Sequence, residues 1–225
     1  MSFGIRSSMA MVLLMVTSSA AAKDAWTAKS VMKEVDKATR DAKWIEGEVH
    51  WNQFLSSSIN VDGKGQVWVD LGGRLRAEVK GNTPRTLLIS PGYVQIYNPL
   101  EKLTEVYRTF GQPDLLVQYA MLGFEPRGSD LKRDYKVAFV KQEEIGGRQT
   151  LLLQLTPKDP EVAEAYPTLM VWIDRTTWLP AQQLIRQGDG GLQVSIVYEN
   201  LVQKPDLPLA LFESDWPEGT RIVRE

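Results

Sequence analysis

The stretch Gln66–Arg108 constrains the fold of this chain most strongly. It divides into runs of strand length, and each break between runs contains the glycine, proline or asparagine that tight turns favour. Within Arg74–Lys80 apolar and charged residues alternate, so that Leu75, Ala77 and Val79 share one face. This pattern is typical of a strand with one dry and one wet side. The stretch therefore predicts a meander of antiparallel strands, forming a curved sheet with an apolar concave face.

The same strand pattern recurs on both sides of this meander. Further strands are predicted over Trp44–Leu55, Tyr135–Val140, Gln149–Leu155, Thr168–Asp174, Trp178–Arg186 and Leu192–Glu199, with a closing strand near Thr220–Val223. A brief apolar segment, Ile59–Val61, precedes the glycine-rich Asp62–Gly65, and both Asp62–Gly65 and Glu125–Asp130 are predicted loops. With no repeat and no long linker, the pattern predicts one α+β domain built on a single sheet.

Two segments have a helical period. Asp24–Ala42 is amphipathic and is expected to cover one side of the sheet. Pro113–Leu122 has proline at its start, Gly123 after its end and almost no polar face. Such a helix is either an ordinary buried helix or a lid over an apolar ligand. We interpret it as a lid, whose amides should be less protected from hydrogen exchange than those of the strands. If it is an ordinary buried helix, its amides should be as well protected as those of the strands.

Composition narrows the classes of function. The chain has 225 residues and a formal net charge of -2, which argues against nucleic acid or an anionic membrane surface as a partner. It has no cysteine, and its only histidine, His50, lies in a strand pattern, so neither a His/Cys metal site nor a catalytic triad is expected. Glu143 and Glu144 are adjacent in a strand and face opposite ways. The glycines around Asp189 lie between two strands and predict a hairpin rather than a phosphate loop. By elimination, the residues predict that the protein is not an enzyme and that its function depends on shape and apolarity.

The N-terminus has the pattern of a secretory signal peptide. Arg6 precedes an apolar run over Met9–Val16, and Ala20-Ala21-Ala22 fits the cleavage rule. The run is too short to cross a bilayer, and a buried N-terminal helix is the alternative. Residues 1–22 are therefore predicted to be removed, leaving one domain over residues 23–225 in the periplasm.

The order of short motifs along the chain resembles the LolA-like family of periplasmic outer-membrane lipoprotein carriers. The motifs that carry the resemblance are Gln66–Val69, Gly73–Glu78, Leu88–Gly92, Tyr97–Pro99, Leu153–Lys158, Val171–Asp174, Leu179-Pro180 and Phe212 to Gly219. The likeness covers nearly the whole predicted mature chain. At the place where that family has an Arg-Pro pair whose arginine latches the lid, this chain has Leu71-Gly72. Either the latch is absent, or Arg74 or Arg76 takes its role.

The resemblance implies an open antiparallel β half-barrel with helices covering its concave face, in which acyl chains of lipoproteins or other lipids bind. It also implies that there is no cofactor and no covalent chemistry. Its implied partners are an inner-membrane donor and an outer-membrane acceptor, and a monomer is expected. The alternative is a lipid- or protein-binding envelope sensor of the same fold. Taking the face of Leu75 as inward, the predicted lipid-binding residues are Leu75, Ala77, Val79, Ile89, Val94, Ile96, Leu116, Tyr119, Leu122, Val137, Phe139, Leu151, Leu153, Leu169 and Val171.

Overall fold

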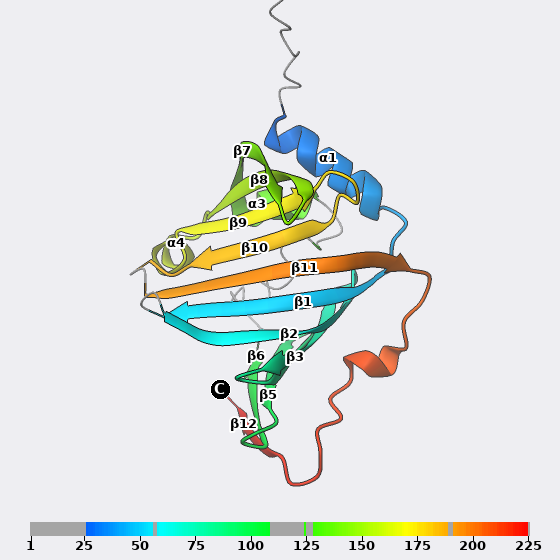
Figure 1. The fold of residues 1–225 in the computed structure, drawn as a ribbon, viewed down its shortest axis with the longest axis vertical. Helices are drawn as coiled ribbons and strands as arrows, with labels where there is room; N and C mark the ends of the chain where they lie inside the picture. The colour runs from blue at the N-terminus through cyan, green and yellow to red at the C-terminus, as the bar shows by residue number, and fades with distance from the viewer. Residues whose placement is uncertain (1–25, 56–57, 109–123, 125–127, 189–190, 225) are drawn as a thin grey trace, which may run out of the picture.

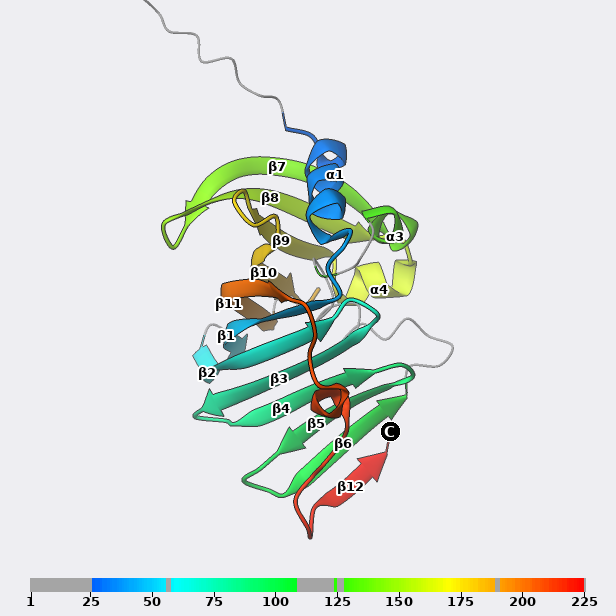
Figure 2. The ribbon, with the colours of Figure 1, turned by 90° about the vertical axis from the view of Figure 1, so that its right-hand side faces the viewer.

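A twelve-stranded sheet dominates the computed structural model, which describes residues 26–55, 58–108, 124, 128–188 and 191–224 (Figure 1). The strand order is β12-β6-β5-β4-β3-β2-β1-β11-β10-β9-β8-β7. All neighbours pair antiparallel except β12 and β6, which pair parallel. The sheet curves without closing, so β12 and β7 remain as edges (Figure 2). The predicted open antiparallel half-barrel is therefore confirmed.

The strands follow the predicted order closely. They are β1 (Trp44–Leu55), β2 (Ser58–Asp70), β3 (Arg74–Gly81), β4 (Arg85–Ser90), β5 (Tyr93–Asn98), β6 (Leu103–Arg108), β7 (Tyr135–Ile145), β8 (Arg148–Pro157), β9 (Thr168–Asp174), β10 (Pro180–Arg186), β11 (Leu192–Lys204) and β12 (Arg221–Arg224). The final strand β12 was expected to close the sheet. It instead pairs with β6 and extends that edge.

Helix α1 (Ala28–Thr39) lies across the concave side of the second half of the sheet (Figure 2). It begins at a capping box, in which the Thr27 and Ser30 side chains each bond to the backbone N–H of the other residue. Its apolar stripe, Val31, Met32 and Val35, is buried against β8, β9 and β10. The amphipathic pattern correctly predicted a helix covering one side of the sheet, but it extended the helix to Ala42, three residues beyond its end at Thr39.

Two short α-helices and one 3-10 turn complete the described part of the chain. They are α3 (Gly128–Asp134), α4 (Pro160–Ala165) and η1 (Leu209–Phe212). The loop predicted over Glu125–Asp130 was wrong in its second half, because α3 begins at Gly128. The predicted lid helix Pro113–Leu122 and the predicted signal peptide lie outside the described residues. Within the described segments, no helix is long and apolar enough to span a bilayer.

The loop predicted over Asp62–Gly65 was also wrong, because β2 runs through it without a break. The glycines there serve close packing instead of a turn. A Cβ on Gly65 would lie 1.6 Å from the carbonyl oxygen of Glu78 in the neighbouring strand β3. Only glycine lets the two backbones approach this closely.

The concave face carries two core clusters. The first is centred on β1 to β5 and β11, where Tyr198 donates a hydrogen bond of 2.9 Å to Gln183 Oε1 and meets the edge of Phe124. Burial raises the pKa of the Tyr198 phenol. The second cluster lies beneath α1 on β8, β9 and β10. Val194 of β11 packs against both, so the clusters meet there.

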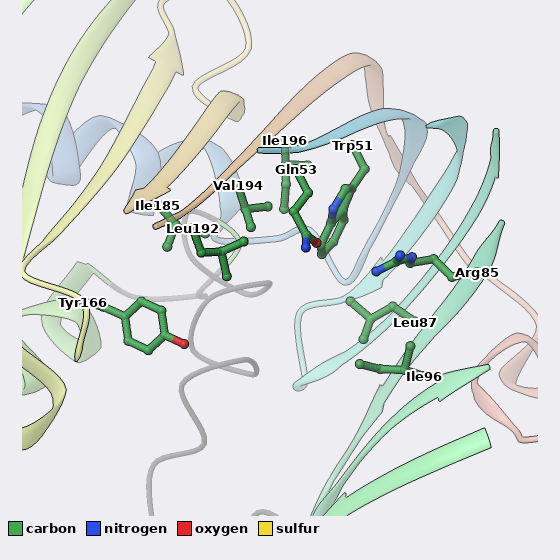
Figure 3. A pocket seen from close by; sticks show the side chains of 10 residues that line it. All are labelled: Trp51, Gln53, Arg85, Leu87, Ile96, Tyr166, Ile185, Leu192, Val194 and Ile196. Atoms are coloured by element: carbon green, nitrogen blue, oxygen red, sulfur yellow. The ribbon is translucent and has the colours of Figure 1, made fainter. Parts of the chain in front are cut away.

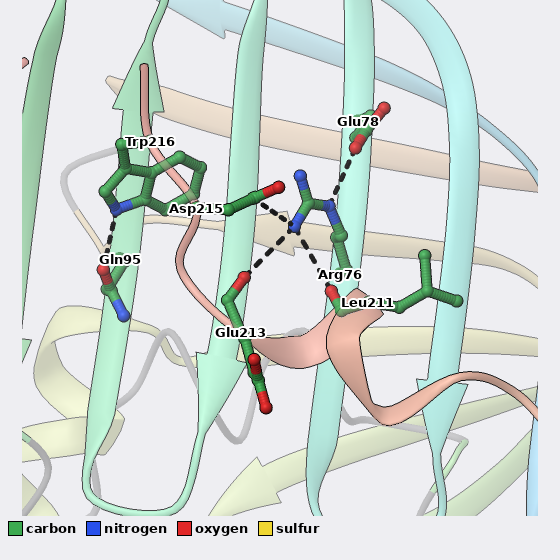
Figure 4. A network of polar contacts seen from close by, with 7 residues as sticks. All are labelled: Arg76, Glu78, Gln95, Leu211, Glu213, Asp215 and Trp216. Carbon is green, nitrogen blue, oxygen red and sulfur yellow. Dashed lines mark hydrogen bonds and ion pairs between the residues drawn. The ribbon is translucent and has the colours of Figure 1, made fainter. Parts of the chain in front are cut away.

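The C-terminal segment crosses the convex face of β3 to β6 and is held there by Arg76 (Figure 4). The Arg76 guanidinium donates to the backbone carbonyls of Leu211 and Glu213 at 3.2 and 3.4 Å, and lies 3.5 Å from the Asp215 carboxylate. Trp216 stacks on Tyr97 with ring centroids 4.9 Å apart. These contacts bring β12 alongside β6.

Candidate functional site

A largely apolar cavity of about 200 Å³ lies on the concave side, where the two core clusters meet (Figure 3). Its lining comes from five strands and from the residue that ends α4. The lining residues are Trp51, Gln53, Arg85, Leu87, Ile96, Tyr166, Ile185, Leu192, Val194 and Ile196. Most of this surface is aliphatic or aromatic, which is the usual character of a small-molecule site.

The curvature of the sheet creates the cavity. Strands β4 and β5 are separated from β10 and β11 by β3, β2 and β1 in the strand order. Because the sheet bends, Leu87 and Ile96 on one side lie across the cavity from Ile185 and Val194 on the other (Figure 3). Trp51 of β1 lies between these two walls.

Two side chains of the lining contribute buried N–H groups that find no partner among the described residues. In the described part of the chain, Trp51 Nε1 and Arg85 Nε are buried without a hydrogen bond. The third such buried polar atom is Thr104 Oγ1, which does not line the cavity. An unpaired buried donor costs about 1–3 kcal/mol, and more when it is charged. Two such donors on one small cavity are the groups of its lining with which an acceptor could pair.

Arg85 is the one charged residue of the cavity lining in the described structure. It shares the inward face of β4 with Leu87 and Ile89, and its guanidinium points towards Trp51 (Figure 3). Burial lowers the pKa of the guanidinium, and the Glu105 carboxylate of β6 raises it in part. Among the described residues, no carboxylate comes within the 4.0 Å of an ion pair with Arg85. Within the described residues, the charge thus has an attractive neighbour in Glu105 but no ion-pair partner.

A second, more polar pocket of about 210 Å³ adjoins the first. Arg85 and Ile96 line both, so they form the boundary between the two spaces. The second pocket adds the carboxylates of Glu101 and Glu105. The positive charge therefore lies between an apolar space and an acidic one.

The predicted lipid-binding residues fall into five groups. Ile96 lines the apolar cavity, and Leu75 and Ala77 line a void of about 10 Å³, room for at most one water molecule. The others of the first cluster are buried in its packing: Val79, Ile89 and Val94. The members in or against the second cluster are Leu151, Leu153, Leu169, Val171, Val137 and Phe139. Leu116, Tyr119 and Leu122 lie outside the described residues.

Only some of the residues that line the cavity could be predicted from the sequence. Strand alternation places Arg85 on the same face as Leu87 and Ile89, so an arginine at an inward position was the available signal. Trp51 likewise follows Val49 at a two-residue step. Leu192 begins the predicted strand Leu192–Glu199 and alternates with Val194 and Ile196. Tyr166 follows a short helix, and no periodicity places it.

Neither arginine suggested as a replacement latch lies on the concave face. Arg74 is 3.6 Å from the Asp70 carboxylate, and Arg76 holds the C-terminal segment on the convex side. Leu71, which takes the place of the family arginine, is buried in the first core cluster. Arg74 and Arg76 therefore face away from the cavity, and Arg85 is the arginine that lines it. The predicted lid, which such a latch would hold, lies outside the described residues.

His50, the histidine of the chain, does not belong to the described lining of the cavity. His50 Nε2 lies 2.6 Å from Asp62 Oδ1 at an exposed position away from the cavity. Nowhere in the described segments do three histidine, aspartate or glutamate side chains gather as metal ligands would. Within this part of the chain the cavity can surround and orient a ligand by shape, apolarity and one positive charge.

Comparisons with known proteins agree with this fold. A family described as an uncharacterized protein matches residues 125–203. A comparison with curated proteins gives no match. An uncharacterized conserved protein from Thermus thermophilus is similar in structure at 10% identity, with a TM-score of 0.56, over 88% of this chain and 99% of that one.

Two further solved structures are similar at lower TM-scores. A LolA superfamily protein from Nitrosomonas europaea has 15% identity and a TM-score of 0.43, over 86% of this chain and all of that one (100%). MucB, in its complex with MucA from Pseudomonas aeruginosa, has 19% identity and a TM-score of 0.45, over 83% of this chain and 60% of that one. At these identities the likeness concerns the fold alone. The half-barrel expected from the resemblance is the fold observed.

Proposed function

We propose that this protein binds acyl chains in the apolar cavity and carries lipoproteins or other lipids through the periplasm towards the outer membrane. The observation that supports this most is the cavity of about 200 Å³ between the two core clusters. It offers the room of about six groups of water size, at ~30 Å³ each. Six buried methylenes would contribute about 5 kcal/mol, enough to hold a chain and still release it.

We infer a role in binding rather than in catalysis. Where the structure describes the lining, it has no histidine, serine, threonine or carboxylate that could act as nucleophile or base on a ligand. The polar groups there are Gln53, the Arg85 guanidinium, the Trp51 indole and the Tyr166 phenol. Such groups orient a ligand.

The periplasmic location and the partners belong to the same proposal. The predicted signal peptide over residues 1–22 supports export. A carrier of acyl chains needs a donor at the inner membrane and an acceptor at the outer membrane, because free acyl chains are poorly soluble. A non-transport sensor of the same fold is the second candidate, and it differs in not passing its ligand on.

Filling the cavity tests the binding site. Val194→Trp places a large side chain in the cavity and is expected to reduce binding of a fluorescent acyl probe at least about tenfold, the loss of roughly two buried methylenes. Val202→Trp is the matched control, since Val202 lies on the same strand but is 48% exposed and outside the cavity. Equal binding by a folded Val194→Trp protein would show that the acyl chain binds elsewhere.

Transfer distinguishes the two candidate roles. The parent protein loaded with the acyl probe is mixed with acceptor vesicles, and movement of fluorescence into the vesicles is followed. A carrier releases the probe at a rate that depends on vesicle concentration. Tight retention of the probe would favour the sensor.

A further inference from the structure

We propose that the cavity selects amphiphiles whose acyl chain ends in an oxyanion, a carboxylate or phosphate, and that Arg85 and Trp51 bind this head group. The inference rests on the proposed acyl-binding function and adds the chemistry of the ligand's polar end. It starts from the unpaired donors of the lining.

Both unpaired groups are N–H donors, and neither can accept. Trp51 Nε1 and Arg85 Nε are buried and lack partners among the described residues. They belong to the same cavity, and the Arg85 guanidinium points towards the Trp51 ring (Figure 3). Buried polar groups in native proteins are nearly always satisfied, so two orphan donors at one site call for an oxygen acceptor supplied by a ligand.

The charge of Arg85 makes a negative acceptor the best match. A guanidinium remains protonated at any physiological pH and binds carboxylate and phosphate oxygens through parallel N–H bonds. A neutral head group, such as an alcohol, would satisfy a hydrogen bond but leave the buried charge unbalanced. The site therefore discriminates by charge as well as by shape.

The rest of the lining requires that the anion be attached to an apolar chain. Leu87, Ile96, Ile185, Val194 and Ile196 surround the space beside the two donors. A free inorganic anion would leave this surface without a partner. An acyl chain with an anionic end satisfies the donors and the apolar walls together.

Glu105 is an internal competitor for Arg85. It attracts the guanidinium but does not form an ion pair with it. Glu101 lines the same adjoining pocket. An anionic ligand is bound against the repulsion of these carboxylates, so removing the nearer one should strengthen binding. This gives the proposal two substitutions with opposite expected effects.

The experiment compares four ligands with the same twelve-carbon chain: laurate, dodecyl phosphate, dodecanol and dodecyltrimethylammonium. Each is titrated below its micelle concentration against the full-length exported protein, by displacement of a fluorescent acyl probe. Laurate and dodecyl phosphate are expected to bind at least about tenfold more tightly than dodecanol, a difference of about 1.4 kcal/mol. Added salt should weaken the two anions and leave dodecanol unchanged. Acetate and inorganic phosphate should not displace the probe at the same concentrations.

Substitutions assign the effect to the named residues. Arg85→Met should abolish the preference for the anions while dodecanol still binds, and Trp51→Phe should reduce it. Glu105→Gln should tighten laurate binding severalfold. Arg186→Met is the matched control: Arg186 follows Ile185 on β10, is exposed, and does not line the cavity. If Arg85→Met does not fold, the salt dependence and the Glu105→Gln variant carry the test.

The outcomes separate this proposal from the proposed function. If dodecanol binds as tightly as the anions, or if Arg85→Met leaves the preference intact, the head-group proposal is refuted and acyl binding stands. Tighter binding of the cationic amphiphile, or displacement by inorganic phosphate, refutes it as well. If none of the four amphiphiles binds, the proposed function fails together with it.

Discussion

Arg76→Met should release the C-terminal segment from the convex face while leaving the rest of the sheet folded. The Arg76 side chain is 12% exposed and reaches that segment at three points: the carbonyls of Leu211 and Glu213 and the carboxylate of Asp215. It also lies 6.0 Å from the centre of the Trp216 ring. Methionine retains the length and apolar stem of the side chain but none of these polar contacts.

The magnitude follows from the type of each contact. Hydrogen bonds from a charged donor contribute about 1.5–3 kcal/mol each, and those at 3.2 and 3.4 Å belong at the low end. The pair with Asp215, whose side chain is 78% exposed, adds little. We therefore expect the docked segment to lose about 3 kcal/mol relative to the undocked one. The equilibrium for its opening should rise about a hundredfold.

Hydrogen exchange measures this opening directly. The amides of β12 should exchange about a hundredfold faster in Arg76→Met than in the parent, while those of β8 and β9 keep their protection. Arg74→Met is the matched control, because Arg74 is on the same face of β3 but makes only a 3.6 Å ion pair with Asp70. It should change the free energy of unfolding by less than about 0.5 kcal/mol. Unchanged protection of β12 in Arg76→Met would refute the reasoning.

Three further predictions concern the core. Val35→Asp buries an unpaired charge beneath α1, because Val35 is only 8% exposed. It should lower the free energy of unfolding, measured by denaturant titration, by about 3 kcal/mol. An unchanged midpoint would show that this helix face is open to water. Because burial raises the pKa of Tyr198, the unfolded chain loses this proton first, above about pH 10, and stability should then fall by about 1.4 kcal/mol per pH unit. Tyr198→Phe should remove that contribution to the alkaline slope, and an identical slope would contradict it. Gly65→Ala forces β2 and β3 apart and should destabilise the protein by about 3 kcal/mol, so a neutral result in thermal melting would contradict the close approach.

Strand alternation predicted the sheet well because one face is buried along almost every strand. The inward residues of Arg74–Lys80 are buried as predicted, and β1 has the predicted bounds. The prediction failed where the local composition favours a turn but packing against a neighbouring strand favours an extended chain. Gly63 and Gly65 have the composition of a turn, yet they continue a strand, because the constraint on them comes from the backbone of β3.

The candidate site was harder to predict for a geometric reason. Alternation identifies which residues face inward, but it does not show which inward residues pack together and which leave space. That depends on how far the sheet bends, which brings Ile96 opposite Ile185 and buries Leu153 under α1. The sequence indicates that Arg85 faces inward among aliphatic residues. It does not indicate that Arg85 lies at the boundary of two pockets.

The two edges of the sheet bear on how the protein behaves at high concentration. An open sheet presents unpaired peptide groups at each edge, and other chains can add there as further strands. At one edge stands β12, only four residues long, with exposed Arg221 and Arg224. At the other, β7 has a bulge between Phe139 and Lys141, and it carries exposed lysines at 136 and 141. Short length, irregular register and like charges at these edges disfavour the addition of strands from other chains.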